Sequence, residues 1–150
     1  MREVLGVYRN TVTVFNFHKE SNLWYSTVIS GVHMEAVRAA SPSAGAGILK
    51  TDAVEVIIPV SDDKTIGTGY ESKQYLRPKE YDVLDDPSNY FTFHPEQDFF
   101  VIGDHDTSPE DDDDYDEGFY HAMNTSLDEV YMISAAAFYA LLPHFEVRGR

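Results

Sequence analysis

Five separated segments of the chain are rich in Val, Ile, Thr, Tyr and Phe, whereas Gly, Pro, Asn and Asp gather between them. β-Branched and aromatic residues favour strands, and the residues between the segments favour turns. The pattern therefore predicts a mainly β fold, a small antiparallel β-barrel or sandwich with long loops and one or two short helices. The five segments are residues 11–17, 23–32, 52–60, 90–103 and 129–147.

The first two segments predict a β-hairpin over residues 11–30. Apolar and polar residues alternate through Val12, Val14 and Asn16, and residues 18–22 (HKESN) supply the turn between the two strands. Gly31 interrupts the second segment, and a glycine within a strand pattern is typical of a bulge or a tight barrel corner. We therefore expect the chain to bend at Gly31.

Two further segments give expectations about the edges of the sheet. Pro59 cannot donate a ladder hydrogen bond, so an edge or strand-terminal position is expected for it. The strand over residues 52–60 is predicted to lie at a sheet margin. The small residues of 39–49 (AASPSAGAGIL) predict a loop that is longer than a hairpin needs. Residues 144–150 are predicted to form one more strand at the end of the chain.

Short helices are predicted at two places. Pro78 suits the first turn of a helix over residues 79–84, because its missing N–H would be unpaired at that position in any case. Residues 135–142 (AAAFYALL) are predicted to form a second short helix, which ends before Pro143 because a proline disfavours helical geometry in the residue that precedes it.

The composition predicts one globular domain over residues 1–150, because 43% hydrophobic and 13% aromatic residues suffice for one core. The chain contains no Cys, which excludes disulfides, thiolate nucleophiles and Cys-ligated metal sites. The N-terminal region lacks the pattern of a signal peptide, and no apolar run approaches the roughly 20 residues of a membrane helix. These features predict a protein that works in a cytoplasm-like setting without membrane contact.

The net charge bears on the partners. With 11 basic and 26 acidic residues, the chain carries a formal charge of −15 at pH 7. Such a surface repels nucleic acid, since binding to phosphates depends on Lys and Arg that release counterions. Specific binding of DNA or RNA is therefore not expected. Repulsion within the chain also predicts that salt, cations or basic partner surfaces stabilise the fold.

Residues 104–117 (DHDTSPEDDDDYDE), here called the acidic tract, hold nine acidic residues in fourteen. They are predicted to form a solvated, mutually repelling loop, inserted at residues 104–120. An EF-hand loop is not matched, because the sixth and twelfth positions counted from Asp104 are Pro109 and Tyr115. The tract is the candidate for contact with cations or a basic partner, through Asp104, Asp106, Glu110, Asp111, Asp112, Asp113, Asp114, Asp116 and Glu117.

No catalytic motif accompanies these patterns. The six His include no HExxH and no pair at helical spacing, and the Gly pairs lack the lysine of a phosphate-binding loop. We therefore predict no catalytic, cofactor-binding or metal-ligating residue, no cofactor and no enzymatic activity. Trp24 and Tyr25 are candidate interface anchors, because Trp and Tyr are enriched in binding hot spots. The alternative is that both are buried aromatic residues of the barrel.

Six stretches in chain order resemble small proteins of tailed bacteriophages, whose genes commonly lie between the capsid and tail genes. The chain thus resembles head-completion or head-tail connector components, including the stopper rings that close a DNA-filled capsid. The resemblance covers most of the chain except residues 104–120. The stretches are TVTVFNF from Thr11, WYSTVISGVHME from Trp24, TDAVEVIIP from Thr51, YLRPKEY from Tyr75, YFTFHPEQDFFVIGD from Tyr90 and HFEVRGR from His144.

The resemblance implies a viral structural protein, a non-enzymatic β-barrel subunit of an oligomeric ring, commonly sixfold, in the virion neck. The implied partners are further copies, portal or adaptor proteins, and tail-completion proteins, with assembly in the host cytoplasm. DNA is expected to pass nearby without specific binding, because like charge removes the attraction that slows it. Unless cations neutralise it, the acidic tract is expected on the outer or axial face of such a ring, because copies of the tract in a narrow lumen would repel one another strongly.

Two other classes of protein are kept as alternatives. A soluble ligand-binding β-barrel would use its aromatic residues as pocket walls, and is expected to be a monomer with a concave apolar site. A metal-dependent enzyme would need His and carboxylate groups that converge around an open coordination position. The oligomeric state separates the ring hypothesis from both alternatives.

Overall fold

The computed structural model describes residues 10–37, 53–61, 64–68 and 71–150. It is 50% strand and 14% helix, which confirms the predicted mainly β fold. The predicted loop over residues 39–49 lies outside the described residues. The elements are β1 (Asn10–His18), β2 (Leu23–Val37), β3 (Ala53–Pro59), β4 (Thr65–Thr68), β5 (Glu71–Tyr75), α2 (Pro78–Asp82), β6 (Tyr90–Phe91), β7 (Phe99–Ile102), β8 (Glu110–Asp111), η1 (Asp112–Asp114), α3 (Phe119–Ser126), β9 (Val130–Tyr139) and β10 (His144–Gly149).

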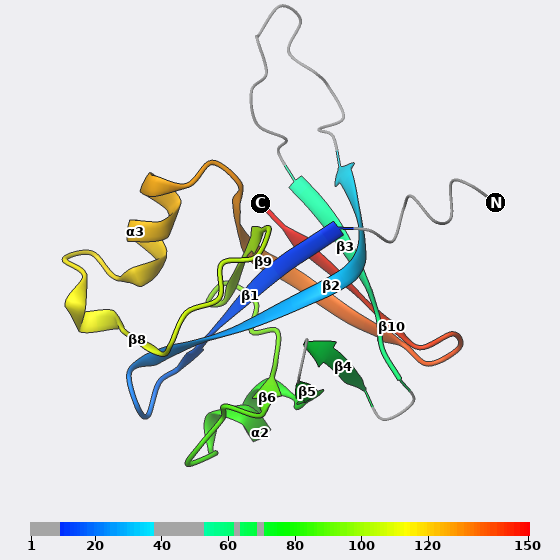
Figure 1. The fold of residues 1–150 in the computed structure, drawn as a ribbon, viewed down its shortest axis with the longest axis horizontal. Coiled ribbons are helices and arrows are strands. Elements are labelled where there is room, and N and C mark those ends of the chain that lie inside the picture. Colours follow the sequence, from blue (N-terminus) through cyan, green and yellow to red (C-terminus); the bar gives the residue numbers. More distant parts are fainter. Residues whose placement is uncertain (1–9, 38–52, 62–63, 69–70) are drawn as a thin grey trace, which may run out of the picture.

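Six strands form a closed antiparallel β-barrel in the order β1-β7-β9-β10-β3-β2, and the pairing of β2 with β1 closes it. The long strand β2 makes closure possible, because its first part pairs with β1 and its residues from His33 to Val37 pair with β3. Gly31 lies at this change of partner with φ +72, beside a register shift in β1. The bend predicted at Gly31 is therefore confirmed, and Figure 1 shows β2 running along two neighbours.

The hairpin predicted over residues 11–30 is also confirmed. The two strands pair up to His18 and Leu23, and the connection between them is the predicted turn. Asn22 has a left-handed φ of 61, and its N–H donates to the carbonyl of Lys19 at 3.2 Å. Asn tolerates this backbone region better than most residues, so the chain reverses here without a glycine.

The prediction that the 52–60 strand lies at a sheet margin is wrong. The strand β3 pairs with β2 on one side and β10 on the other. Pro59 is tolerated because it is the last residue of the strand, beyond Ile57, where pairing with β2 ends. Closure of the barrel gives β3 a paired strand on each side. Pro59 lies beyond the last residue that pairs with β2, so its missing N–H costs no ladder hydrogen bond to β2.

Of the two predicted helices, one is confirmed and one is wrong. The helix α2 begins at Pro78, as predicted, and ends two residues earlier than expected, at Asp82. Residues 135–139 instead belong to β9, and Ala135, Ala136 and Ala137 pair with β10. Helix propensity is a weak preference that tertiary pairing overrides. The helix α3, between the acidic tract and β9, was not predicted.

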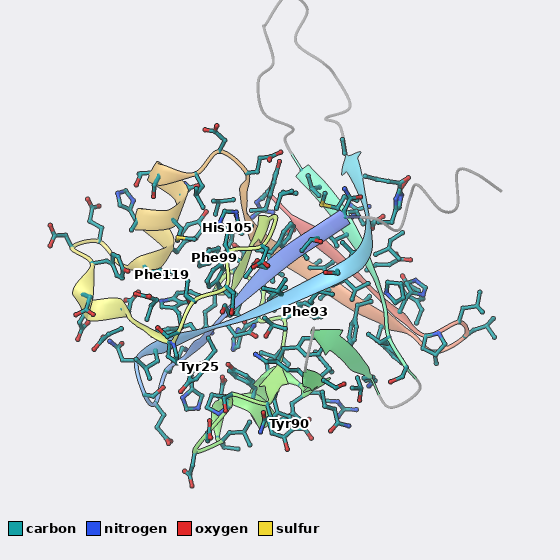
Figure 2. All side chains as sticks on the ribbon, in the orientation of Figure 1. Tyr25, Tyr90, Phe93, Phe99, His105 and Phe119 are labelled. Atoms are coloured by element: carbon teal, nitrogen blue, oxygen red, sulfur yellow. The ribbon has the colours of Figure 1, made fainter. Side chains whose placement is uncertain are left out.

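The barrel interior is filled by side chains from alternate strand positions and from the segment between β6 and β7. The rings of Phe91, Phe93 and Phe145 pack edge to face, with centroids 5.5 Å apart for the first two and 5.1 Å for Phe93 and Phe145. Figure 2 places Phe93 within the barrel. The interior cluster consists of Val12, Val14, Ile29, Val32, Val54, Val56, Ile58, Phe91, Phe93, Phe100, Tyr131, Ile133, Phe145 and Val147.

A second core lies outside the barrel wall, beneath α3. Phe15 stacks on Phe99 at 4.9 Å, and Phe119 of α3 meets Phe15 edge-on at 5.4 Å. Figure 2 shows Phe99 and Phe119 between the barrel and α3. The strand β1 is therefore buried on both faces, with Val14 in the interior cluster and Phe15 in this outer core. The outer core consists of Phe15, Trp24, Phe99, Val101, Phe119 and Val130.

A small second sheet and α2 lie against one part of the barrel (Figure 1). The sheet has the order β4-β5-β6, with β5 and β6 parallel. Tyr75 of β5 packs its ring on Phe145 at 4.6 Å, which ties this sheet to the interior cluster. Within the described part of the chain, no helix is long and apolar enough to cross a membrane.

Candidate functional site

The acidic tract follows the outside of β2 and leads into α3. Its strand β8 pairs with the start of β2, through Asp111 with Leu23 and Glu110 with Trp24. The N–H of Asp112 donates to the carbonyl of Asn22 at 3.1 Å. The prediction of a solvated loop is therefore wrong for this part of the tract, because the backbone of the same chain provides its partners.

Three carboxylates of the tract, those of Asp106, Asp111 and Asp112, accept hydrogen bonds from residues outside it. Asp112 Oδ1 accepts from Trp24 Nε1 at 2.9 Å and from the backbone N–H of Phe119 at 2.8 Å. Asp111 Oδ1 accepts from Asn22 Nδ2 at 2.9 Å, and the Oδ1 of Asp106 accepts from a serine of β2 at 2.8 Å. Hydrogen bonds to a charged group contribute about 1.5–3 kcal/mol each. These bonds give the tract order that its composition did not suggest.

The remaining acids of the tract have no such role in holding the barrel. Glu110 accepts from the Tyr115 hydroxyl at 2.7 Å, and Glu117 lies 3.6 Å from His121 one turn along α3. The described residues contain no group of three or more His, Asp or Glu side chains that could hold a metal ion. Contact with cations or a basic partner stays a prediction, and its exposed candidates are Asp104, Asp106, Asp113, Asp114, Asp116 and Glu117.

The two candidate interface anchors lie in different surroundings. Trp24 is only 5% exposed, and its ring packs 5.2 Å from Phe99 and 5.9 Å from Phe119. Trp24 is thus a buried residue of the outer core, and the alternative interpretation is confirmed for it. Tyr25 is half-buried and meets the ring of His18 edge-on at 6.3 Å (Figure 2).

Asp112→Ala is expected to lower the free energy of unfolding by about 2 kcal/mol, because the N–H groups of Trp24 and Phe119 lose their common acceptor. Asp113→Ala and Asp114→Ala remove exposed carboxylates of the same tract, and each is expected to change that free energy by less than about 0.5 kcal/mol. Urea denaturation followed by tryptophan fluorescence measures all three. Equal effects would mean that the tract acts on stability through its charge alone.

A buried carboxylate, Asp98, lies where the segment between β6 and β7 meets β1. Its Oδ2 accepts from Asn16 Nδ2 at 2.8 Å and from the backbone N–H of His94 at 3.1 Å. Its Oδ1 accepts from the backbone N–H of Phe17 at 3.0 Å and from Gln97 Nε2 at 3.2 Å. Asp98 is a site residue that the sequence did not reveal, because nothing in the local pattern distinguishes a buried Asp from an exposed one.

Further polar groups surround this carboxylate beneath α2. The Tyr81 ring is fully buried and meets the ring of His18 edge-on at 5.8 Å. Burial, and next the charge of Asp98, raise the pKa of the Tyr81 hydroxyl well above its usual range. His94 Nε2 lies 3.5 Å from Asp82 Oδ2. These contacts tie β1, the turn before β7 and α2 together, which indicates a structural role for the cluster.

Burial raises the pKa of the Asp98 carboxyl from 3.8 to about 6, although the donors of Phe17, Asn16 and Gln97 act in the opposite direction. The folded state therefore holds this proton more tightly than the unfolded state. The contribution of Asp98 to the free energy of unfolding is full below pH 3.8 and is lost as the pH rises through about 6.

We therefore expect the unfolding free energy of the wild type to fall, relative to Asp98→Asn, as the pH rises from 4 to 7. The Asn variant has no titrating group at this position, so the effects of other titrating groups largely cancel in the difference. Urea denaturation at steps of pH measures both proteins. If the unfolding free energy of the wild type instead rose relative to that of Asp98→Asn as the pH increased, the donors would stabilise the carboxylate more than burial destabilises it.

Among the described residues, the tip of the β9–β10 hairpin, residues 139–143, is the main exposed apolar feature. Leu141 is 89% exposed, Leu142 81% and Tyr139 46%. Leu142 has a left-handed φ of 55, which is unfavourable for a bulky residue and is typical of Asn or Gly. A surface hollow of about 500 Å³ lies beside the tip, lined by Ile57, Pro59, Leu141, Leu142, Pro143 and His144.

The sequence did not reveal this tip, because the run AAAFYALL was interpreted as a helix. The signal that distinguishes it is the pair of leucines directly before Pro143, at a position where a hairpin turn usually has polar residues or glycine. His144 begins the next strand, and its Nδ1 lies 2.8 Å from the Leu142 carbonyl. That contact, and the Glu146 carboxylate 3.0 Å from its Nε2, raise the pKa of His144.

The chain belongs to a family described as a family of unknown function, DUF6751, whose model matches residues 7–150. The matched range includes the acidic tract, Asp98 and the hairpin tip. The comparison with curated proteins and the comparison with solved structures gave no match. Membership of this family supplies no activity, partner or site.

Proposed function

We propose that this chain is a non-enzymatic structural subunit of a tailed-phage virion neck, in a head-completion, head-tail connector or stopper ring. The observation that carries this proposal is the contrast between a filled barrel and an apolar tip that projects from it. Within the described residues, aromatic side chains occupy the barrel interior, while Leu141 and Leu142 are almost fully exposed on a hairpin. Contiguous apolar patches on a protein surface are typical of sites of contact with other proteins.

The filled interior also bears on the ligand-binding alternative. Tyr75, Phe91, Phe93 and Phe145, which a ligand-binding barrel would use as pocket walls, pack against one another with ring centroids 4.6–6.3 Å apart. Side chains that fill a core in this way are committed to its stability. The geometry therefore favours a protein that works through its outer surface.

The charge is compatible with a channel that DNA crosses. A formal charge of −15 per chain would become a large negative field in a ring of several copies. DNA that passes such a ring is repelled and gains no counterion release by adhering to it. The ordered acidic tract adds to this field and, on this proposal, faces outward or along the axis of the ring.

Cryo-electron microscopy of intact particles from the phage that encodes the chain tests this function. We expect the barrel to fit density between the head and the tail, in a cyclic arrangement. Particles made without the chain should contain heads that lose DNA or fail to join tails. The proposal is wrong if the chain is missing from purified particles, or if particles made without it are infectious at the normal yield.

A further inference from the structure

Exposed large hydrophobic residues occur at two separate places on the described part of the chain. One is the β9–β10 tip, with Tyr139, Leu141 and Leu142, and the other is Val83, directly after α2, which is 74% exposed. Figure 1 shows the tip and α2 well apart on the molecule. A single two-fold contact uses one surface twice, whereas two different surfaces suit a head-to-tail contact between copies.

A surface hollow lies at the start of α2, the helix that Val83 follows. It has a volume of about 440 Å³ and is lined by Arg77, Pro78, Lys79 and Glu80. The Glu80 carboxylate accepts from the backbone N–H of Arg77 at 3.0 Å, which turns it toward the helix start. Two basic groups and one acid give this lining a charge of +1, on a chain whose charge is −15. We call it the α2 hollow.

We propose that the β9–β10 tip of one copy docks into the α2 hollow of a second copy. This inference rests on the ring proposed above and names the two surfaces that would build it. Leu141 and Leu142 would bury their side chains against Pro78, Val83 and the aliphatic stems that line the hollow. Burying apolar surface stabilises a contact by about 25 cal/mol per Å² before the cost of association.

Charge explains why these two surfaces meet. Copies that each carry −15 repel one another, so they approach best where one surface is uncharged and the other is basic. Residues 139–145 contain no Asp or Glu. Glu146, at the base of the tip, is partly exposed, and its carboxylate lies 3.0 Å from His144 Nε2. The tip and the α2 hollow are complementary in this sense.

The left-handed backbone at Leu142 supports the same conclusion. A bulky residue with φ 55 is strained, and backbone strain of this kind clusters at functional sites. Asn or Gly would relieve the strain and remove the apolar contact at once. The structure thus keeps an exposed leucine where the turn alone would favour a different residue.

Two variants, each damaged on one side of the contact, test the proposal by analytical ultracentrifugation at about 0.15 M salt, where exposed charges are screened over about 8 Å. Leu142→Asp removes the tip, and Lys79→Glu combined with Val83→Ser removes the hollow. We expect the wild type to form complexes larger than a dimer and each variant alone to be a monomer. An equimolar mixture of the two variants should form dimers, because one intact tip then meets one intact hollow.

Asn124→Asp, which adds one charge on the exposed face of α3, is the matched control and should assemble like the wild type. Urea denaturation of every variant shows whether the fold is kept. A wild type that stays monomeric, or a tip variant that assembles normally, overturns the proposal. A hollow variant that assembles normally while the tip variant does not would mean that the tip docks elsewhere, which also overturns it.

The outcome is independent of the neck function. Head-to-tail complexes of a chain that is missing from purified particles would support the contact and contradict the neck. A chain that occupies the neck but assembles unchanged with Leu142→Asp would support the neck and contradict the contact.

Discussion

Asp98→Ala is expected to lower the free energy of unfolding at pH 5 by about 4 kcal/mol, one of the two largest single-residue effects that the described structure predicts. Four N–H donors converge on this carboxyl, from Asn16, Phe17, His94 and Gln97. Each buried donor left without an acceptor costs about 1–3 kcal/mol, and the costs within one network are not additive. Because the donors come from β1 and from the turn before β7, their loss also loosens that turn.

Urea denaturation followed by the fluorescence of the single tryptophan, which is buried in the outer core, measures this effect. Asp128→Ala is the control, since Asp128 is exposed and its removal should change the free energy by less than about 0.5 kcal/mol. Asp98→Asn should lower the free energy of unfolding less than Asp98→Ala and more than Asp128→Ala, because Asn keeps one carbonyl oxygen as an acceptor. An Asp98→Ala protein as stable as the wild type would show that the network contributes little to the fold.

Gly149→Ala is expected to lower the free energy of unfolding by about 3 kcal/mol. A Cβ at this position would lie 2.6 Å from Phe100 Cε2 and 2.8 Å from Tyr131 Cβ, far closer than carbon atoms approach. Both neighbours belong to the interior cluster, so neither can move without disturbing the packed barrel. The strand β10 shifts register against β9 at Gly149, which brings its backbone onto the Phe100 ring.

A double variant shows whether the ring is the cause. Phe100→Leu removes the atoms nearest to the added methyl group, so Gly149→Ala should cost less in that background than in the wild type, by about 1 kcal/mol or more. Arg148→Ala, at the neighbouring exposed position, should cost less than about 1 kcal/mol, since it removes only a surface ion pair with Glu55. Strict additivity of the two core changes would contradict the steric explanation.

The features that sequence analysis predicted correctly depend on short stretches of chain. The hairpin over residues 11–30 follows from alternation and from a turn of five residues, and the bend follows from Gly31 alone. Pro78 marks the start of α2 because the effect of a proline on a helix is local. None of these elements needs information about distant residues.

The wrong predictions concern residues whose environment is set by distant parts of the chain. Ala135, Ala136 and Ala137 favour a helix locally, but β10 pairs with them because the barrel needs a strand at that position. Pro59 indicated a margin, but the barrel has none for β3. Asp112 belongs to a charged run, but a tryptophan from β2 donates to it across the chain.

Of the candidate surfaces, the sequence reveals the acidic tract, whereas only the fold reveals the β9–β10 tip. The acidic tract is visible in the sequence, because charge density needs no structure to be counted. That Asp111 and Asp112 hold β2 and α3, while Asp113 and Asp114 stay exposed, depends on which carboxylates meet N–H donors in the fold. The β9–β10 tip emerges only once the alanine-rich run is a strand, since a helix would have placed its two leucines differently.

The sequence by itself determined a mainly β domain, its first hairpin, the start of α2 and a strongly acidic surface, because these follow from local propensity and composition. Only the tertiary structure decided that six strands close into a barrel, that β1 is buried on both faces, and that Asp98 is a fully buried carboxyl with four donors. Closure joins residues far apart in the chain, such as Val12 of β1 with Ile102 of β7, and no local pattern encodes that pairing.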